Sequence, residues 1–137
     1  DSPYSTAISA WCNRVKQGEP LRSDGDGEQT RDMVYVRDVV RANISAASRI
    51  EKFSGDVINI GTGKRVSNNY ILSLFKHQFG DLRVDHAPAR QGDVRDTQAS
   101  NHSAKFKIGW TPKTSLEEGL MKTWEWWDLL DKNKEVS

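Results

Sequence analysis

The sequence predicts a small α/β unit with few short strands and about five helices. Three observations indicate this class: apolar residues recur at helical spacing, short runs rich in Val and Ile lie between them, and Gly or Ser marks many segment ends. The chain has 137 residues, enough for one compact domain, without an internal repeat, low-complexity tract or interdomain linker. We therefore treat residues 1–137 as one unit.

Helices and strands are expected to follow one another along the chain. Helices are predicted over residues 5–17 and 39–50, between Ser67 and Gly80, near 101–107, and after Ser115. Strands are predicted over residues 33–36, 56–60 and 82–84, and irregular chain over 19–29 and 88–100. The strands are few and short, so the helices supply most of the regular structure.

The first two helices are predicted from the spacing of their apolar residues. In the first helix these residues are Ile8, Trp11 and Val15. Gly18 stands where that helix would end, and Asp38 is the expected N-terminal cap of the second helix. The apolar face of the second helix consists of Val40, Ile44 and Ala47.

The later helices are predicted mainly from their ends. Ser67 can cap a helix that ends at Gly80, and Ser115 forms a capping box with Glu118 three positions later. The inward residues of the earlier helix are Ile71, Leu72 and Phe75. The apolar stripe of the last helix consists of Leu116, Leu120, Trp124 and Trp127. Together with Trp126, these tryptophans are interpreted as core plus one half-exposed indole.

Composition limits the function classes. The formal net charge is +1 and the basic residues are scattered over different segments, so no nucleic-acid-binding face is indicated. Cys12 is the only cysteine, which excludes an intrachain disulfide and fits a reducing compartment. The sequence shows no charged leader and no apolar run of membrane length, so we expect a cytoplasmic location without a membrane partner.

A glycine-containing turn fails the phosphate-binding patterns that it resembles. Residues 61–64 (Gly-Thr-Gly-Lys) resemble the end of a phosphate-binding loop, but Ile58 and Arg65 stand where that motif needs Gly and Ser or Thr. Val66 occupies the third glycine position of a dinucleotide fingerprint. The turn therefore predicts no nucleotide triphosphate site.

The metal-binding patterns fail as well. Residues 24–27 (Asp-Gly-Asp-Gly) resemble a calcium loop, but Gln29 and Tyr35 stand where Gly and Glu are required. The histidines, which lack metal-ligand spacing and are interpreted as surface residues, are His77, His86 and His102. No metal site is predicted.

Several segments, in this order and spacing, resemble one family. They are residues 18–21 (GEPL), 25–42 (GDGEQTRDMVYVRDVVRA), 59–63 (NIGTG) with Ser67, 89–95 (ARQGDVR) and 116–120 (LEEGL). They resemble the carboxy-terminal part of extended short-chain dehydrogenases/reductases of the NAD-dependent epimerase/dehydratase family, and most of all UDP-glucose and UDP-N-acetylglucosamine 4-epimerases. The resemblance covers essentially the whole chain, and segment 25–42 is its most specific part.

The resemblance implies substrate-binding roles for four residues. Arg31 and Arg90 match arginines that typically reach the substrate diphosphate, and Asp93 matches a carboxylate that accepts hydrogen bonds from the ribose hydroxyls. Leu21 is the fourth expected contact. Guanidinium groups match phosphate oxygens, and a carboxylate suits a vicinal diol, so the chemistry agrees with these roles. The expected ligand is a UDP-sugar or another nucleotide sugar.

The sequence departs from the family pattern beside these residues. Asp24 stands just before Gly25-Asp26-Gly27, where the family usually has a Tyr or Phe that stacks on the base. Asn69 stands where the family often carries Glu. A diverged member is therefore expected.

The resemblance also implies that catalysis needs residues outside this chain. Family members hold NAD and use a Tyr with a Lys four positions later. The residues four positions after Tyr4, Tyr35 and Tyr70 are Ile8, Val39 and Leu74. The glycine-rich cofactor turn is also absent from the sequence. NAD is thus expected to bind an N-terminal Rossmann portion that this chain lacks, and residues 1–137 are not expected to be catalytic alone.

Three interpretations remain open at this point. The first is the nucleotide-sugar-binding part of a 4-epimerase, an isomerase of polysaccharide biosynthesis. A 4,6-dehydratase or a reductase of the same family would use the same anchor, and a stand-alone, non-catalytic binding module belongs to a different class. The missing portion is the expected partner, and exposed apolar surface could also support a homo-oligomer.

Overall fold

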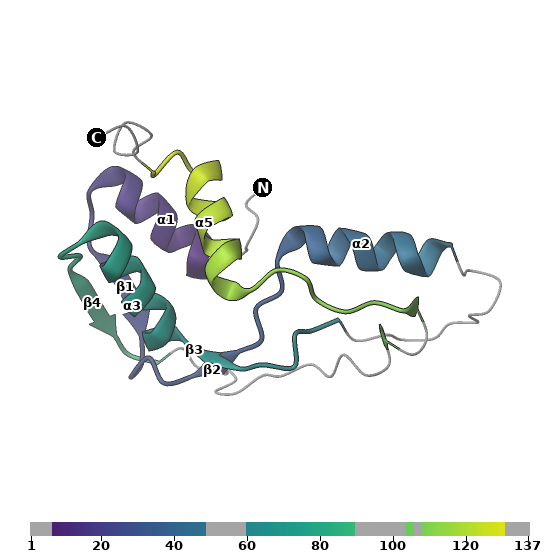
Figure 1. Ribbon diagram of the computed structural model, residues 1–137. Helices are drawn as coiled ribbons and strands as arrows, with labels where there is room; N and C mark the ends of the chain where they lie inside the picture. The colour runs from purple at the N-terminus through teal and green to yellow at the C-terminus, as the bar shows by residue number, and fades with distance from the viewer. Residues whose placement is uncertain (1–6, 49–59, 90–103, 106–107, 131–137) are drawn as a thin grey trace.

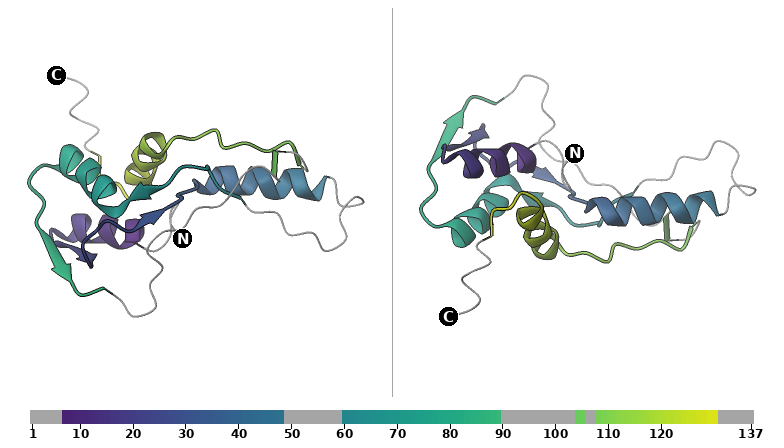
Figure 2. Two further views of the ribbon diagram at one scale, coloured as in Figure 1. Left: turned by 90° about the horizontal axis from the view of Figure 1, so that it is seen from below. Right: turned by 90° about the horizontal axis from the view of Figure 1, so that it is seen from above.

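The fold consists of a helical lobe and a projecting arm. The computed structural model describes residues 7–48, 60–89, 104–105 and 108–130. Figure 1 shows α1 (Ala7–Gln17), α3 (Asn68–Phe79) and α5 (Leu116–Trp126) gathered at one end, while α2 (Val36–Ala47) extends away from them. The two further views in Figure 2 show the same separation. The expected α/β class is confirmed, with these four helices and a few short strands among the described residues.

The strands form two small sheets on the lobe side of the molecule. Strand β1 (Leu21–Asp24) runs parallel to β4 (Val84–Ala87). Strand β2 (Thr30–Arg31) runs antiparallel to β3 (Val66–Ser67) where the arm leaves the lobe. Each sheet has only two strands, so packing of the helices must supply most of the stability.

The strand predictions differ from the structure in position. The stretch 19–29 was expected to be irregular, yet it contains β1, whose residues are alternately buried and exposed. This period of two is hard to see in a sequence because the buried Ser23 is polar. Residues 33–36 form no strand: residues 33–35 are irregular, and Val36 is the first residue of α2. The third strand occupies 84–87 rather than 82–84. The predicted strand 56–60 and the helix near 101–107 lie largely outside the described residues.

The core of the lobe is rich in aromatic residues. Its buried members are Ile8, Trp11, Cys12, Leu21, Tyr35, Ile71, Leu72, Phe75, Leu120 and Trp124. Phe75 packs edge-on against Trp11 and Trp124, with ring centroids 5.8 and 5.4 Å apart. Such contacts contribute beyond the burial of apolar area. The inward residues predicted for α1, α3 and α5 are confirmed. Burial in this core raises the pKa of the Cys12 thiol to about 12.

The predicted helix ends are confirmed for three helices. Gly18 follows α1 with φ +71°, and Gly80 follows α3 with φ +84°, a region that favours glycine. The hydroxyl of Ser67 accepts a hydrogen bond from the Tyr70 amide at 3.0 Å, which caps α3. Ser115 caps α5 in the same way, through the Glu118 amide at 3.1 Å.

The arm is built by α2 and the chain that runs back along it. Ala42, Ala104, Ile108 and Trp110 form a second buried cluster there. The Trp110 indole donates to the Asp38 carbonyl at 2.8 Å, and Arg41 donates to the Thr111 carbonyl at 2.7 Å. These contacts fix the segment around Trp110 beside α2 (Figure 1).

The prediction that Asp38 caps α2 is wrong. The cap position is Tyr35, without a side-chain hydrogen bond, and Asp38 lies inside the first turn. Its carboxylate is nearly buried and accepts hydrogen bonds from the amides of Lys113 and Thr114 at 3.2 and 3.0 Å. Asp38 also pairs with Arg41 at 3.1 Å. It therefore links α2 to the segment that precedes α5.

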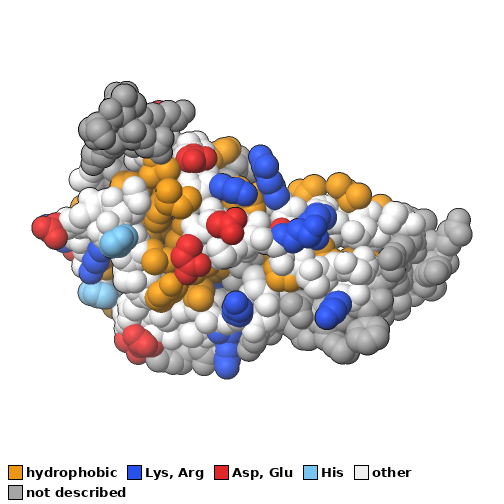
Figure 3. All heavy atoms as spheres, in the orientation of Figure 1, with side chains coloured by type: hydrophobic (Ala, Val, Ile, Leu, Met, Phe, Trp, Pro, Cys, Tyr) orange, Lys and Arg blue, Asp and Glu red, His pale blue; other side chains and the backbone are white. Residues whose placement is uncertain are grey.

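The predicted apolar face of α2 points outward. Val40 and Ile44 are 49% and 65% exposed, and Val36 on the same side is 40% exposed. Figure 3 shows hydrophobic side chains along this edge of the arm. The buried side of α2 instead carries Asp38 and Ala42. None of the helices in the described part of the chain is long and apolar enough to span a membrane.

The tryptophan and histidine interpretations agree with the structure where it describes these residues. Trp124 is buried, Trp127 is partly buried, and Trp126 is 54% exposed. His77 and His86 are exposed, as expected of surface histidines. His102 lies outside the described residues.

Candidate functional site

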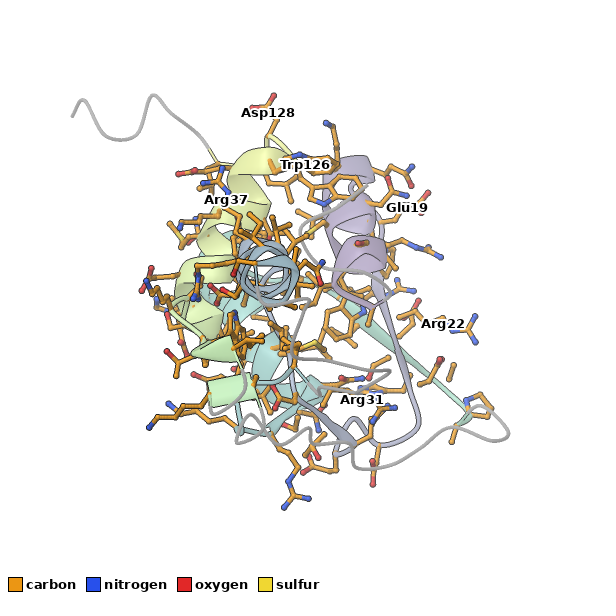
Figure 4. All side chains as sticks on the ribbon, turned by 90° about the vertical axis from the view of Figure 1, so that its right-hand side faces the viewer. Glu19, Arg22, Arg31, Arg37, Trp126 and Asp128 are labelled. Atoms are coloured by element: carbon orange, nitrogen blue, oxygen red, sulfur yellow. The ribbon has the colours of Figure 1, made fainter. Side chains whose placement is uncertain are left out.

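A cavity of about 790 Å³ lies beside α1 and β1 and is lined by the predicted ligand residue Arg31. Two further arginines, Arg14 and Arg22, line the same cavity, together with the carboxylates Asp24 and Asp32. Figure 4 shows Arg22 at the edge of the molecule and Arg31 set further in. Several guanidinium groups around one cavity suit an anionic ligand group such as a phosphate.

Each of the three arginines is held by a neighbour. The Arg22 Nε donates to Asp24 Oδ1 at 3.0 Å, and the Arg14 Nη1 donates to Glu19 Oε2 at 3.1 Å. The Arg31 Nη1 donates to the carbonyl of Thr30 at 2.8 Å. These contacts are partly or fully exposed, so they add little to stability, but they orient the guanidinium groups.

Asn69 fixes the loop that leads from β1 to Arg31. Its side-chain amide donates to the Asp26 carbonyl at 3.0 Å and to the Glu28 carboxylate at 2.5 Å. Its backbone amide donates to the Gly27 carbonyl at 2.9 Å. Gly27 has φ +77° and packs so closely on Asn69 that a Cβ would clash with the Asn69 side chain. The loop therefore requires glycine at this position.

Asp32, the residue after Arg31, holds the turn at residues 61–63. Its carboxylate accepts hydrogen bonds from the amides of Thr62 and Gly63, each at 2.9 Å, and from the Thr62 hydroxyl at 2.6 Å. The Asp32 carboxylate thus already binds the backbone amides that a phosphate would need at this turn. This contact joins the cavity wall to the chain that precedes β3.

The predicted site residues have different positions. Arg31 lines the cavity, whereas Arg90 and Asp93 lie outside the described residues, so their convergence with Arg31 stays a prediction. Leu21 is fully buried in the core of the lobe, so its side chain supports β1 from inside and does not face the cavity.

The sequence analysis missed Arg14, Arg22 and Gln29 as cavity residues. The signal for Arg22 was the alternation along β1, which places it opposite to the buried Leu21 and Ser23. Arg14 lies on α1, and its position became evident only from the packing of that helix beside β1. The Gln29 side chain donates to the Asp24 carbonyl at 3.0 Å and so braces the end of β1.

A second cavity, of about 670 Å³, lies between the chain around β3 and the start of α5. Its basic residues are Lys64, Arg65 and Lys113. The Tyr70 hydroxyl donates to Glu117 Oε1 at 2.8 Å on its wall. This bond is the largest cause of a lowered pKa of Glu117 and a raised pKa of Tyr70.

In the part of the chain that the structure describes, several groups that could contact a cofactor already have partners or are buried. The amides of the turn at 61–63 are bound by Asp32, Tyr35 is buried, and the Tyr70 hydroxyl is bound to Glu117. Among the described residues, no group of three His, Cys, Asp or Glu side chains could hold a metal ion. The guanidinium groups around the Arg31 cavity suit an anionic ligand group.

The fold and the arginine-lined cavity define an α/β protein with a candidate anion-binding site, and comparison with known proteins gives the family. The chain belongs to the NAD dependent epimerase/dehydratase family, whose model matches residues 1–61. A putative UDP-glucose 4-epimerase from Methanocaldococcus jannaschii is 36% identical over 120 residues, covering 87% of this chain and 38% of that protein.

Solved structures of 4-epimerases share the fold. The UDP-glucose 4-epimerase of Thermotoga maritima, in complex with UDP-glucose, is 39% identical with a TM-score of 0.81. The match covers 97% of this chain and 41% of that one. The UDP-glucuronic acid 4-epimerase of Bacillus cereus, in complex with UDP-glucuronic acid and NAD, is 26% identical with a TM-score of 0.85, covering 93% and 41%. The chain thus spans about two fifths of the length of these relatives.

Proposed function

We propose that this chain is the substrate-binding part of an NAD-dependent sugar-nucleotide 4-epimerase, and that the cavity around Arg31 holds the diphosphate of a UDP-sugar. The observation that carries the proposal is the position of Arg31. It belongs to segment 25–42, which is typical of the family, and it lines a cavity that it shares with Arg14 and Arg22. Phosphate oxygens are strong acceptors for guanidinium groups, which supports a diphosphate at this place.

Arg90 and Asp93 are proposed to complete the same site. The amide of Gly25 donates to the carbonyl of Ala87 at the end of β4, at 2.7 Å. Ala89 lies against Gly25, so close that a Cβ on the glycine would be 3.4 Å from the Ala89 Cβ. Ala89 therefore lies beside the loop that leads to Arg31, and Arg90 is the next residue in the sequence, which supports the proposal of a second arginine near the diphosphate.

In the complete enzyme this part would provide anchoring. Holding the nucleotide end fixes the position of the sugar and lowers the entropic cost of reaching the transition state. Arg31 and Arg90 would keep the diphosphate in place while the sugar turns over to present its other face. NAD, when bound, would accept hydride from the sugar and return it. A 4,6-dehydratase or a reductase could use the same anchor.

The residues that hold NAD are proposed to lie in a portion outside this chain, which would also cover the exposed side of α2. Val36, Val40 and Ile44 form an apolar stripe there, and the relatives are more than twice as long as this chain. We expect that V40E together with I44E would prevent binding of a separately produced cofactor portion. The change H77E with Q78E, which adds two carboxylates at exposed positions of α3, should leave it intact. Sedimentation of the mixed chains would measure both results.

Calorimetric titration tests the anchor. UDP and dTDP are expected to bind the isolated chain weakly, and binding should be lost in both R31A and R90A. The R83A variant is a control, because Arg83 is exposed and lies outside the lining of the cavity. If R31A and R90A bind UDP as tightly as the unchanged chain, the anchor assignment is wrong.

A further inference from the structure

The Arg22 guanidinium lies at the rim of the Arg31 cavity with most of its surface exposed. Its side chain is 57% exposed, whereas that of its partner Asp24 is 17% exposed. The Arg22 Nε donates to Asp24 Oδ1 at 3.0 Å. The Nε–H group lies in the plane of the guanidinium, so the edge of the guanidinium points toward Asp24. This hydrogen bond does not cover either face of the guanidinium.

The backbone of Arg22 and Asp24 is held by hydrogen bonds from neighbouring elements. The Trp11 indole donates to the Arg22 carbonyl at 2.8 Å, and Trp11 itself is buried against Phe75. On the strand side, Arg22 stands opposite Asp85 in the parallel pairing of β1 with β4. The Gln29 side chain binds the Asp24 carbonyl. The core, the sheet and the following loop thus limit how far the pair can move.

The described lining of the cavity offers no exposed aromatic ring on which a base could stack. Among the described residues that line it, Trp11 is the aromatic one, and it is only 2% exposed. It therefore has no free face for a ligand. Arginine guanidinium planes stack on nucleic-acid bases in the same manner as aromatic rings.

We propose that the plane of Arg22 is the stacking surface for the base of the bound nucleotide, with Asp24 as the residue that orients it. This inference rests on the proposed function, because it assumes that the diphosphate lies near Arg31. Arg31 and Arg22 would then contact different parts of one ligand. Because every base has a flat face, stacking on Arg22 would favour ligands that carry a base over ligands without one, and would distinguish little between different bases.

The test compares a ligand that has a base with one that lacks it. UDP and pyrophosphate are titrated into the full chain and into R22K, which keeps the charge but has no plane. We expect R22K to bind pyrophosphate as the unchanged chain does, and UDP about three- to five-fold more weakly, the range of an exposed cation–π contact. Circular dichroism of the variant checks that its fold is intact.

A matched control is available on the neighbouring strand. The Arg83 Nε, just before β4, donates to Asp85 Oδ1 at 3.1 Å, which repeats the spacing of Arg22 and Asp24, but Arg83 does not line the cavity. R83K should therefore bind both ligands normally.

The outcomes separate the two proposals. An equal loss of UDP and pyrophosphate in R22K, or no loss of either, would overturn stacking on Arg22. If UDP binding still depends on Arg31 in that case, the proposed function stands. Absence of UDP binding to the unchanged chain, or binding that R31A does not weaken, would overturn both.

Discussion

Asp32 binds Thr62 through two hydrogen bonds, from the amide at 2.9 Å and from the hydroxyl at 2.6 Å, although 30 positions separate the two residues. The same carboxylate accepts the amide of Gly63. The Asp32 side chain therefore fixes the turn at residues 61–63 beside the backbone that carries Arg31. Its loss would disturb both the fold and the cavity wall.

The first prediction concerns this contact. D32A should lower the free energy of unfolding by about 1.5–3 kcal/mol, the range for hydrogen bonds to a charged group. The turn would lose the acceptor for two amides and a hydroxyl. Urea unfolding followed by tryptophan fluorescence measures the change. D81A, at an exposed position, is the control, and equal stability of the two variants would contradict the account.

The second prediction separates a steric clash from backbone strain at glycine. Gly27 and Gly18 both have positive φ, +77° and +71°. A Cβ on Gly27 would clash with Asn69, whereas a Cβ on Gly18 would meet nothing within 4 Å. G27A should therefore destabilise the chain by clearly more than the roughly 1 kcal/mol that positive φ alone costs in G18A.

Relief of the clash gives an internal check on this comparison. Because the Asn69 side chain also holds the loop through Asp26 and Glu28, N69A is itself expected to be destabilising. G27A should therefore cost clearly less in the N69A background than in the unchanged chain. Thermal unfolding of the two single variants and the double variant measures this coupling. If G27A and G18A prove equally destabilising, the close approach of Gly27 and Asn69 is not significant.

The third prediction concerns Asp38. D38A should destabilise the chain by about 1–3 kcal/mol, because it leaves two part-buried amides without their acceptor. These amides belong to Lys113 and Thr114, and the arm should separate from the lobe more easily. Hydrogen exchange of both amides should speed up more than exchange within α3. Unchanged exchange at these two amides would show that Asp38 does not hold the segment.

The fourth prediction concerns pH. The hydrogen bond from Tyr70, followed by smaller effects, lowers the pKa of Glu117 in the folded chain. A lowered pKa stabilises the fold above the ordinary value of 4.5, and this contribution is lost as the pH falls through the folded value. The raised pKa of Tyr70 contributes below the ordinary value of 10.0 and is lost as the pH rises through its folded value.

The bond between Tyr70 and Glu117 therefore stabilises the fold fully at pH values between 4.5 and 10.0, the ordinary pKa values of the two groups. An NMR titration of the Glu117 carboxyl in the unchanged chain and in Y70F tests the assignment. The pKa of Glu117 should rise in Y70F, because the bond from Tyr70 is the largest cause of its lowering. An unchanged Glu117 pKa would show that the bond from Tyr70 is not formed in solution.

Local signals explain which elements could be predicted from the sequence. Ser67 and Ser115 accept hydrogen bonds from residues three positions ahead, so the ends of α3 and α5 depend on chemistry within a few residues. The core faces of α1, α3 and α5 follow from apolar spacing in the same way.

The misplaced features depend on distant contacts. Asp38 has the composition of a cap, but its partners are Lys113 and Thr114, more than 70 positions away. The apolar face of α2 points outward because the buried side is set by packing against Trp110. In the cavity, Arg31 could be predicted from its motif, while Arg14 and Arg22 needed the positions of α1 and β1.

The most direct test of the central claim is an NMR titration of the labelled chain with UDP. The Trp11 indole N–H, which is bound to the Arg22 carbonyl, and the Gln29 side-chain amide lie at the proposed site and should shift together. The Trp110 indole, buried in the arm, should not move. Shifts confined to residues around Lys113 and Tyr70, or the same shifts in R31A, would contradict binding of the nucleotide at Arg31.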